Sequence, residues 1–221
     1  MSVTSQLLAV RQTLPAHVRL VAVSKYQPEE KLEEAYRAGQ RLFGENRVQE
    51  LCRKQQALPA DIEWHFIGHL QRNKVKYIAP FVAMIQSVDT PELFEEIERQ
   101  GARCGRVLPC LAEIHVAAEE SKSGFSEEEF FAWLASGALS RLPHVRLCGL
   151  MGMATNTGDA SVVKADFQRL KSCFDRAGMQ CFPADPAFST LSMGMSGDYL
   201  LAISCGATMV RLGTTIFGSR G

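Results

Sequence analysis

A lysine that directly follows an apolar strand is one residue of this sequence that could do chemistry. Lys25 comes after the run LVAVS, so its amine would lie beside buried side chains. Desolvation favours the neutral form of an amine, and a neutral amine can attack an aldehyde. The alternative is that Lys25 begins a solvent-exposed loop, and its position alone favours that alternative.

Two clusters of glycine and hydroxyl residues near the end of the chain could bind a phosphate group. The run LSMGMSGDY places Ser196 between a strand and a helix, and RLGTTIFG places Gly213 and Thr214 after the last strand. Free backbone N–H groups, small residues and hydroxyls at such junctions favour an anion, although they could also form ordinary tight turns. Together with Lys25, the clusters suggest a phosphorylated aldehyde cofactor, and pyridoxal 5′-phosphate (PLP) fits that description.

Arg211, in the strand before the second cluster, would set the electronic character of such a cofactor. An arginine beside the pyridine nitrogen donates a hydrogen bond and stays charged, so the nitrogen remains unprotonated. The ring is then a weak electron sink, whereas PLP enzymes that form carbanions use a carboxylate at this place. Arg211 therefore predicts a protein that does little chemistry with its cofactor.

The hydrophobic pattern predicts a scaffold that brings these strand ends together. Short apolar runs alternate with amphipathic segments, which is typical of βαβ units and a parallel sheet. Eight runs without a compositional break predict an α/β fold, a single (β/α)8 TIM barrel domain over residues 1–221 with an extra N-terminal helix, whose function lies at the C-terminal strand ends. An open doubly wound sheet is the alternative, although no G-x-G-x-x-G follows the first strand.

The expected elements can be given as residue ranges. The strands are expected at 19–24, 40–44, 62–68, 83–88, 107–116, 145–153, 189–193 and 208–213. The helices are expected at 3–13, 28–38, 45–57, 70–79, 90–103, 126–138, 160–178 and 196–206. Thr90 before Pro91, and Ser126 before three glutamates, are typical helix starts.

Composition argues against several classes of protein. The 24 basic residues equal the 24 acidic ones, which argues against a nucleic-acid or membrane partner held by bulk charge. The apolar runs are too short to span a bilayer, and the N-terminus lacks a signal-peptide pattern. Seven scattered cysteines without a C-x-x-C pair predict reduced thiols in a cytoplasmic protein. His65 and His69 lack an H-E-x-x-H pattern, so no zinc site is expected.

Several motifs, in the expected order along most of the chain, resemble the YggS/PROSC family of pyridoxal phosphate homeostasis proteins. They are LVAVSK, FGENRVQE, WHFIGHLQRNK, SKSG, GLMGMAT, LSMGMSGDY and MVRLGTTIFG. The resemblance implies a barrel like the N-terminal domain of alanine racemase. It also implies PLP bound through the lysine after the first strand, and a role in intracellular PLP homeostasis without an established catalytic activity.

The family pattern assigns a role to each matching residue of this sequence. Lys25 would carry PLP as a Schiff base, Asn46 would be a neighbour of the cofactor, and Arg211 would partner the pyridine nitrogen. The phosphate ligands implied are Ser196, Gly213 and Thr214.

Three further positions bear on the family assignment. Lys122, in SKSG, matches a lysine proposed in the family to make a second, transient PLP contact, although it could also be a solvated loop charge. Tyr26-Gln27 replaces a common Thr-Lys, and Arg47 replaces a frequent tyrosine. The loss of a lysine beside the cofactor puts in doubt any transfer mechanism that needs it, but not Schiff-base formation.

The main expectation is a non-catalytic protein that buffers PLP or delivers it to PLP-dependent apo-enzymes. One alternative is a PLP-dependent amino-acid racemase of the alanine racemase type, whose second base is a tyrosine from a C-terminal β-domain. The sequence runs only a few residues past the eighth strand, so no such domain is expected and a monomer is favoured. A PLP-free lysine aldolase acting on a phosphorylated sugar is a third alternative, but its lysine typically lies on a later strand.

Overall fold

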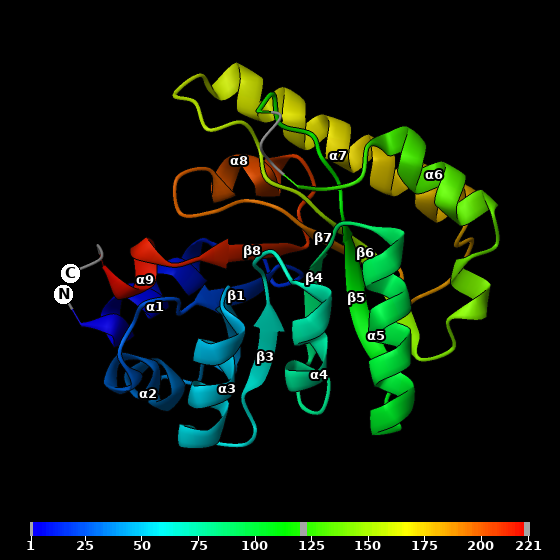
Figure 1. The fold of residues 1–221 in the computed structure, drawn as a ribbon. Helices are drawn as coiled ribbons and strands as arrows, with labels where there is room; N and C mark the ends of the chain where they lie inside the picture. The colour runs from blue at the N-terminus through cyan, green and yellow to red at the C-terminus, as the bar shows by residue number, and fades with distance from the viewer. Residues whose placement is uncertain (1, 120–122, 219–221) are drawn as a thin grey trace.

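Eight parallel strands close into a barrel in the computed structural model, which describes residues 2–119 and 123–218 (Figure 1). Each strand pairs with the next one along the chain, and β1 pairs with β8 to close the ring. The expected barrel is therefore confirmed, and the open-sheet alternative is wrong. The strands are β1 (Arg19–Val23), β2 (Leu42–Glu45), β3 (Glu63–Phe66), β4 (Met84–Val88), β5 (Leu108–Glu113), β6 (Val145–Met151), β7 (Thr190–Ser192) and β8 (Met209–Leu212).

Helices cover the outside of the ring (Figure 1). They are α1 (Val3–Thr13), α2 (Glu29–Arg37), α3 (Val48–Ala57), α4 (Val75–Ile78), α5 (Pro91–Cys104), α6 (Glu127–Ala135), α7 (Ala160–Gln180), α8 (Tyr199–Ser204) and α9 (Thr214–Phe217). The extra helix α1 packs against α2 and α9, and so links the two ends of the chain. Within the two described ranges, no helix combines the length and the apolar character that crossing a membrane requires.

Most helix boundaries follow the start signals in the sequence. The side chain of Thr90 caps α5, and Ser126 caps α6 as part of a capping box with Glu129. Three expected starts are wrong. The helix expected from residue 70 is replaced by a 3-10 turn over Arg72–Lys74, and α4 begins only at residue 75. The segment from residue 45 continues β2, because Glu45 pairs with Phe66 in the ladder, and α3 begins only at residue 48. The helix expected from residue 196 begins at residue 199, because a hydrogen-bonded turn occupies residues 195–198.

Alternate residues of the strands divide between two environments. Leu20 and Ala22 of β1 join the large core between the strands and the helices. Val21 instead packs with Leu42 and Met209, from the two neighbouring strands, as expected for side chains that face the inside of a barrel. The strands also bury polar and charged side chains, namely Glu45, His65, Gln86, Ser87, Glu113, Ser192 and Arg211.

A bulge in β6 depends on a glycine. Cys110 pairs with Leu147, but the next residue, Leu111, pairs with Gly149, so Cys148 is an extra residue in β6. Gly149 has φ +145°, and a Cβ there would lie 1.8 Å from the carbonyl oxygen of Thr190. The bulge therefore requires a residue without a side chain at position 149.

We predict that Gly149→Ala lowers the free energy of unfolding by about 3 kcal/mol or more, because the added methyl overlaps backbone that cannot move freely. Denaturant unfolding followed by circular dichroism measures the change. Gly158→Ala is the matched control, since a Cβ there meets nothing within 4 Å. Equal stability of the two variants would contradict the close approach of β6 to β7.

Candidate functional site

Lys25 is the second residue after β1, at the C-terminal end of the barrel, and is half-buried. Lys54 lies on α3, and its ammonium group is completely buried. The ammonium donates to the carbonyl oxygen of Ser24, the residue before Lys25, at 2.7 Å. It also donates to Oε1 of Glu45 at 2.6 Å and to Oε1 of Glu50 at 2.8 Å. This charged cluster joins β1, β2 and α3 immediately beside Lys25.

The cluster also holds the residue that follows Lys25. Tyr26 has a left-handed backbone, with φ 63°, and its N–H donates to Oε1 of Glu50 at 2.9 Å. Ser24, on the other side, donates its hydroxyl to Oε1 of Glu45 at 2.6 Å. Burial raises the pKa of Glu45, and Lys54 opposes that rise. Both neighbours of Lys25 are thus fixed by the same buried charges.

The two positions that depart from the family pattern contact each other. The guanidinium of Arg47 lies 5.0 Å from the centroid of the Tyr26 ring, within the range of a cation–π contact. Gln27 is buried and accepts a hydrogen bond from Nζ of Lys31 at 3.0 Å. The replacements therefore form a local arrangement of their own at the rim beside Lys25.

A turn with convergent donors lies where β8 ends. The hydroxyl of Ser196 accepts long hydrogen bonds from the backbone N–H groups of Gly213 (3.3 Å) and Thr215 (3.4 Å). Thr214 begins α9, so its amide belongs to the first turn, where N–H groups lack intrahelical acceptors. A Cβ on Gly213 would lie 3.3 Å from the carbonyl oxygen of Val23. The donors of this turn therefore lie beside the last residue of β1, two residues before Lys25.

The guanidinium of Arg211 is buried close to this turn. Its Nη1 donates to the carbonyl oxygen and to Oγ of Ser192, at 2.8 and 2.6 Å, and its Nη2 donates to the carbonyl oxygen of Gly152 at 3.0 Å. Two of the five N–H donors of the side chain therefore have no acceptor among residues 2–119 and 123–218. Burial lowers the pKa of Arg211 to about 10, which leaves it charged at neutral pH.

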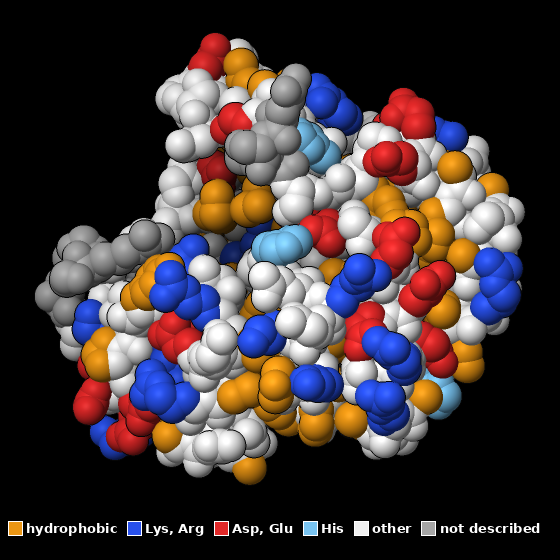
Figure 2. All heavy atoms as spheres, in the orientation of Figure 1, with side chains coloured by type: hydrophobic (Ala, Val, Ile, Leu, Met, Phe, Trp, Pro, Cys, Tyr) orange, Lys and Arg blue, Asp and Glu red, His pale blue; other side chains and the backbone are white. Residues whose placement is uncertain are grey.

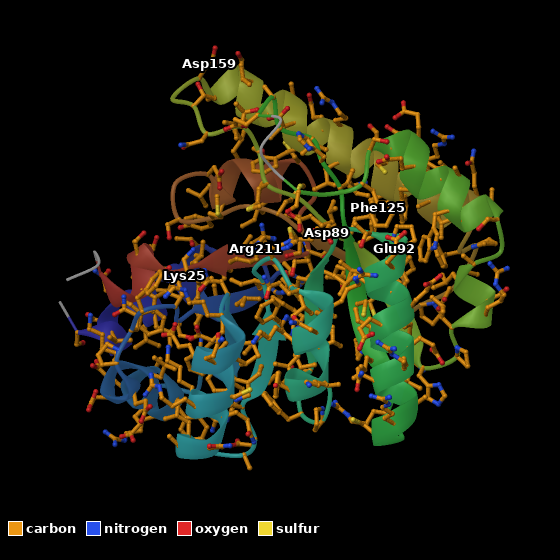
Figure 3. All side chains as sticks on the ribbon, viewed as in Figure 1. Lys25, Asp89, Glu92, Phe125, Asp159 and Arg211 are labelled. Atoms are coloured by element: carbon orange, nitrogen blue, oxygen red, sulfur yellow. The ribbon has the colours of Figure 1, made fainter. Side chains whose placement is uncertain are left out.

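Two of these groups, Lys25 and Arg211, lie at the same end of the barrel, with Asp89 nearby (Figure 3). Figure 2 shows a hollow at this place, with basic side chains in its depth. A groove of about 800 Å³ between the loops after β6 and β7 includes Ser196 in its wall. This groove can admit a small molecule beside Ser196, but Lys25, Arg211 and Gly213 are not among the residues that line it.

Two acidic residues of the site were not anticipated from the sequence. Glu113 ends β5 and is 3% exposed. Burial and, to a lesser extent, Asp89 raise its pKa to about 7, although Arg211 acts in the opposite direction. Oδ2 of Asp89, directly after β4, lies 3.1 Å from Nδ1 of His69. Because functional residues of a barrel lie at the C-terminal strand ends, the positions of Glu113 and Asp89 in the sequence could have indicated them.

The remaining expected residues can also be placed. Asn46 lies in the bend between β2 and α3, and its Oδ1 is buried without a hydrogen-bond partner among the described residues. Lys122 lies outside the described residues. His65 is buried in the barrel, and the described part of the chain contains no group of three side chains suited to a metal ion. Five of the six expected ligands follow strands at the C-terminal end of the barrel, and Arg211 lies within β8, one residue before its end. The five are Lys25, Asn46, Ser196, Gly213 and Thr214.

This set of groups fits a phosphorylated aldehyde with an aromatic nitrogen. Lys25 supplies a primary amine, and the turn at Gly213 supplies backbone donors for a phosphate. Arg211 has N–H donors to spare for a ring nitrogen, and the buried Oδ1 of Asn46 lacks a partner that a ligand could provide. The amine of Lys25, the spare donors of Arg211 and the unpartnered Oδ1 of Asn46 therefore match polar groups of PLP. The donors of the turn at Gly213 now make only long bonds to a hydroxyl, which a phosphate could replace.

Comparisons with known proteins point in the same direction. The family model "Alanine racemase, N-terminal domain" matches residues 2–221. Relatives called pyridoxal phosphate homeostasis protein include that of Pasteurella multocida, which is 40% identical over 92% of this chain and 87% of its own. The relative from Synechocystis is 38% identical over 99% of this chain and 98% of its own.

Solved structures show the same fold. PipY of Synechococcus elongatus is 36% identical and aligns with TM-scores of 0.90 without PLP and 0.87 with PLP bound, over 98% of this chain and 100% of PipY. Alanine racemase from Bartonella henselae is 16% identical, with a TM-score of 0.75 over 99% of this chain and 58% of the racemase. The racemase comparison supports the barrel fold alone.

We predict that Lys54→Met lowers the free energy of unfolding by about 3–5 kcal/mol, because the buried carboxylate of Glu45 and the half-buried one of Glu50 lose their cation. Lys171→Met is the matched control, since its ion pair with Asp175 is exposed to solvent and should contribute less than about 1 kcal/mol. Urea unfolding of both variants measures the difference. Equal losses would show that the buried cluster does not stabilise the fold.

Glu113 should make stability depend on pH. Its pKa is raised from 4.5 to about 7 in the folded protein, so the folded state holds a proton that the unfolded state releases within this window. Stability from this group is therefore lost as the pH rises from 4.5 to 7. The glutamine of Glu113→Gln does not titrate, so this variant should not lose that stability. We therefore expect the difference in free energy of unfolding, variant minus original protein, to rise by about 2 kcal/mol between pH 5 and pH 8.

Denaturant unfolding at the two pH values tests this expectation. Glu95→Gln, at an exposed position of α5, is the control and should follow the original protein at both pH values. A pH-independent difference for Glu113→Gln would contradict the raised pKa.

Proposed function

The chain belongs to the family of pyridoxal phosphate homeostasis proteins, and we propose that it binds PLP as a Schiff base on Lys25 and holds it for intracellular PLP homeostasis. The observation that carries the proposal is the grouping of an amine, a phosphate-binding turn and a charged arginine at one barrel opening. The name of the relatives and the PLP-bound structure of PipY support it.

Each part of the cofactor has a matching group in the chain. Bound PLP would supply an aldehyde that condenses with a primary amine and a ring that withdraws electrons. Lys25 would hold the aldehyde carbon, while Ser196, Gly213 and Thr214 would hold the phosphate. Asn46 would contact the cofactor through its buried side-chain oxygen. A lysine and a phosphate site on neighbouring strands would hold a small ligand at two points.

Arg211 supports a role in holding the cofactor over one in catalysis. Its pKa of about 10 means that the guanidinium stays charged at neutral pH and donates hydrogen bonds without giving up a proton. A ring nitrogen beside it would remain unprotonated, and the ring would stabilise negative charge poorly. The protein is accordingly proposed to turn over no amino acid at a substantial rate.

The homeostatic role is a buffering or delivery role. We propose PLP-dependent apo-enzymes as the recipients of the cofactor, and an intracellular site of action. A single domain over residues 1–221 would suffice for this role, since all six proposed ligands lie on one barrel. Lys122 is proposed as a second point of PLP contact on the basis of the SKSG motif alone.

We predict that the purified protein mixed with PLP is yellow and that borohydride bleaches it, whereas Lys25→Ala stays colourless after removal of free PLP. Lys164→Ala, which changes an exposed lysine on α7, should behave like the original protein. Absorption spectra after gel filtration measure the effect. A Lys25→Ala protein that retains the bound chromophore would overturn the proposed attachment.

The racemase alternative makes a different prediction. Hydrogen exchange at the α-carbon of alanine or serine in deuterated water, followed by NMR, should remain close to the rate given by free PLP. Exchange faster by about a thousandfold, and lost in Lys25→Ala, would favour a racemase over a carrier.

A further inference from the structure

A chain of hydrogen bonds crosses the inside of the barrel and ends on Arg211. Nη1 of Arg211 on β8 donates to Oγ of Ser192 on β7 at 2.6 Å, and this hydroxyl donates to Oε1 of Gln86 on β4 at 2.7 Å. Nε2 of Gln86 lies 2.7 Å from Nδ1 of His65 on β3. All four side chains are at most 4% exposed, so water does not compete for these bonds.

The arginine at one end fixes the direction of every bond in this chain. A guanidinium can only donate, so the Ser192 oxygen accepts from it and directs its own hydrogen to the Gln86 oxygen. The amide nitrogen of Gln86 must then donate, so Nδ1 of His65 accepts. His65 is therefore neutral, with its hydrogen on Nε2.

The surroundings of His65 agree with a neutral ring. Burial, with a smaller effect of Arg19, lowers the pKa of His65 to about 3. Gln86 also directs its Nε2 towards the sulfur of Met209 at 3.2 Å. The far end of the chain is thus an acceptor that keeps its protonation state across the neutral pH range.

Arg211 has an alternative partner from which the chain separates it. The carboxylate of Glu113 attracts Arg211 electrostatically but lies beyond ion-pair distance in the described structure, whose ion pairs do not include this one. A guanidinium released from Ser192 could turn towards that carboxylate and use its remaining donors there. The hydrogen bonds from Arg211 to His65 therefore keep the spare donors of Arg211 away from Glu113.

We propose that Ser192, Gln86 and His65 are positioning residues that hold the guanidinium of Arg211 in one orientation and reserve its two spare N–H donors for a ligand in the barrel opening. This inference rests on the proposed function only for the identity of the ligand, which is then PLP. The hydrogen-bond order itself is a property of the protein alone.

The first test uses the protein without cofactor. NMR of ¹⁵N-histidine-labelled protein, with the His65 signal among the five histidines identified from its loss in His65→Asn, reports which ring nitrogen carries hydrogen. We expect an unprotonated Nδ1 and a protonated Nε2 on His65 from pH 5.5 to 8, and a mixture of tautomers in Ser192→Ala. A protonated Nδ1 in the original protein would overturn the proposed order.

The second test measures PLP binding and the absorption band of bound PLP. Ser192→Ala, Gln86→Leu and His65→Leu should each bind PLP about tenfold more weakly, since each loses a bond in the chain that ends on a charged group. Each should also shift the absorption band, because the donors near the ring nitrogen move. His65→Asn keeps an acceptor near the place of Nδ1. It should therefore bind PLP within about twofold of the original affinity and show the absorption band of the original protein.

Gln40→Leu is the matched control for the loss of a buried amide. Gln40 is 3% exposed, and its Nε2 donates to the carbonyl oxygens of Leu20 and Leu42, away from Arg211. Gln40→Leu should lower the free energy of unfolding about as much as Ser192→Ala, Gln86→Leu and His65→Leu do, but it should leave the absorption band of bound PLP unchanged. Chain variants that fold and keep the original affinity and band would overturn the proposal. Failure of the original protein to bind PLP would instead overturn the proposed function, and the tautomer test would still decide the hydrogen-bond order.

Discussion

The site depends on the burial of one ammonium group. Nζ of Lys54 has left water completely, and its charge is balanced by Glu45, Glu50 and the carbonyl oxygen of Ser24. Because an unpaired charge at this depth would cost several kcal/mol, β1, β2 and α3 must meet in one arrangement. That arrangement fixes the residues on both sides of Lys25, including the left-handed backbone of Tyr26. Lys25, the proposed attachment point of PLP, is thus positioned by charged side chains of two neighbouring elements.

A second polar network serves the other half of the opening. Barrel closure pairs Ala22 with Leu212, which brings the residues after β1 and β8 together. Beneath them, Arg211 is bonded into the barrel through Ser192 and Gly152. One network therefore places an amine, the other places a cationic donor, and the turn at Gly213 lies between the two strands that carry them. Such an opening suits a ligand that is held by several groups at once.

The sequence predicts the barrel well because its signals are local. Each strand is a short apolar run, and α5 and α6 begin at caps that the sequence shows, so all eight strands and the ends that carry Lys25 and Arg211 were expected. Features that depend on partners far away in the sequence were not expected. Nothing in the helical pattern around Lys54 indicates that it is buried, since its partner Glu45 comes from another element. The chain from Arg211 to His65 likewise joins four strands, and α9 is too short for a periodic signal.

The most direct test of the central claim is to identify the lysine that bonds to PLP. The protein would be incubated with PLP, reduced with borohydride, digested and analysed by mass spectrometry. We expect one stoichiometric phosphopyridoxyl group, on the peptide that contains Lys25. A stoichiometric label on a different lysine, or no label on the folded protein, would contradict it.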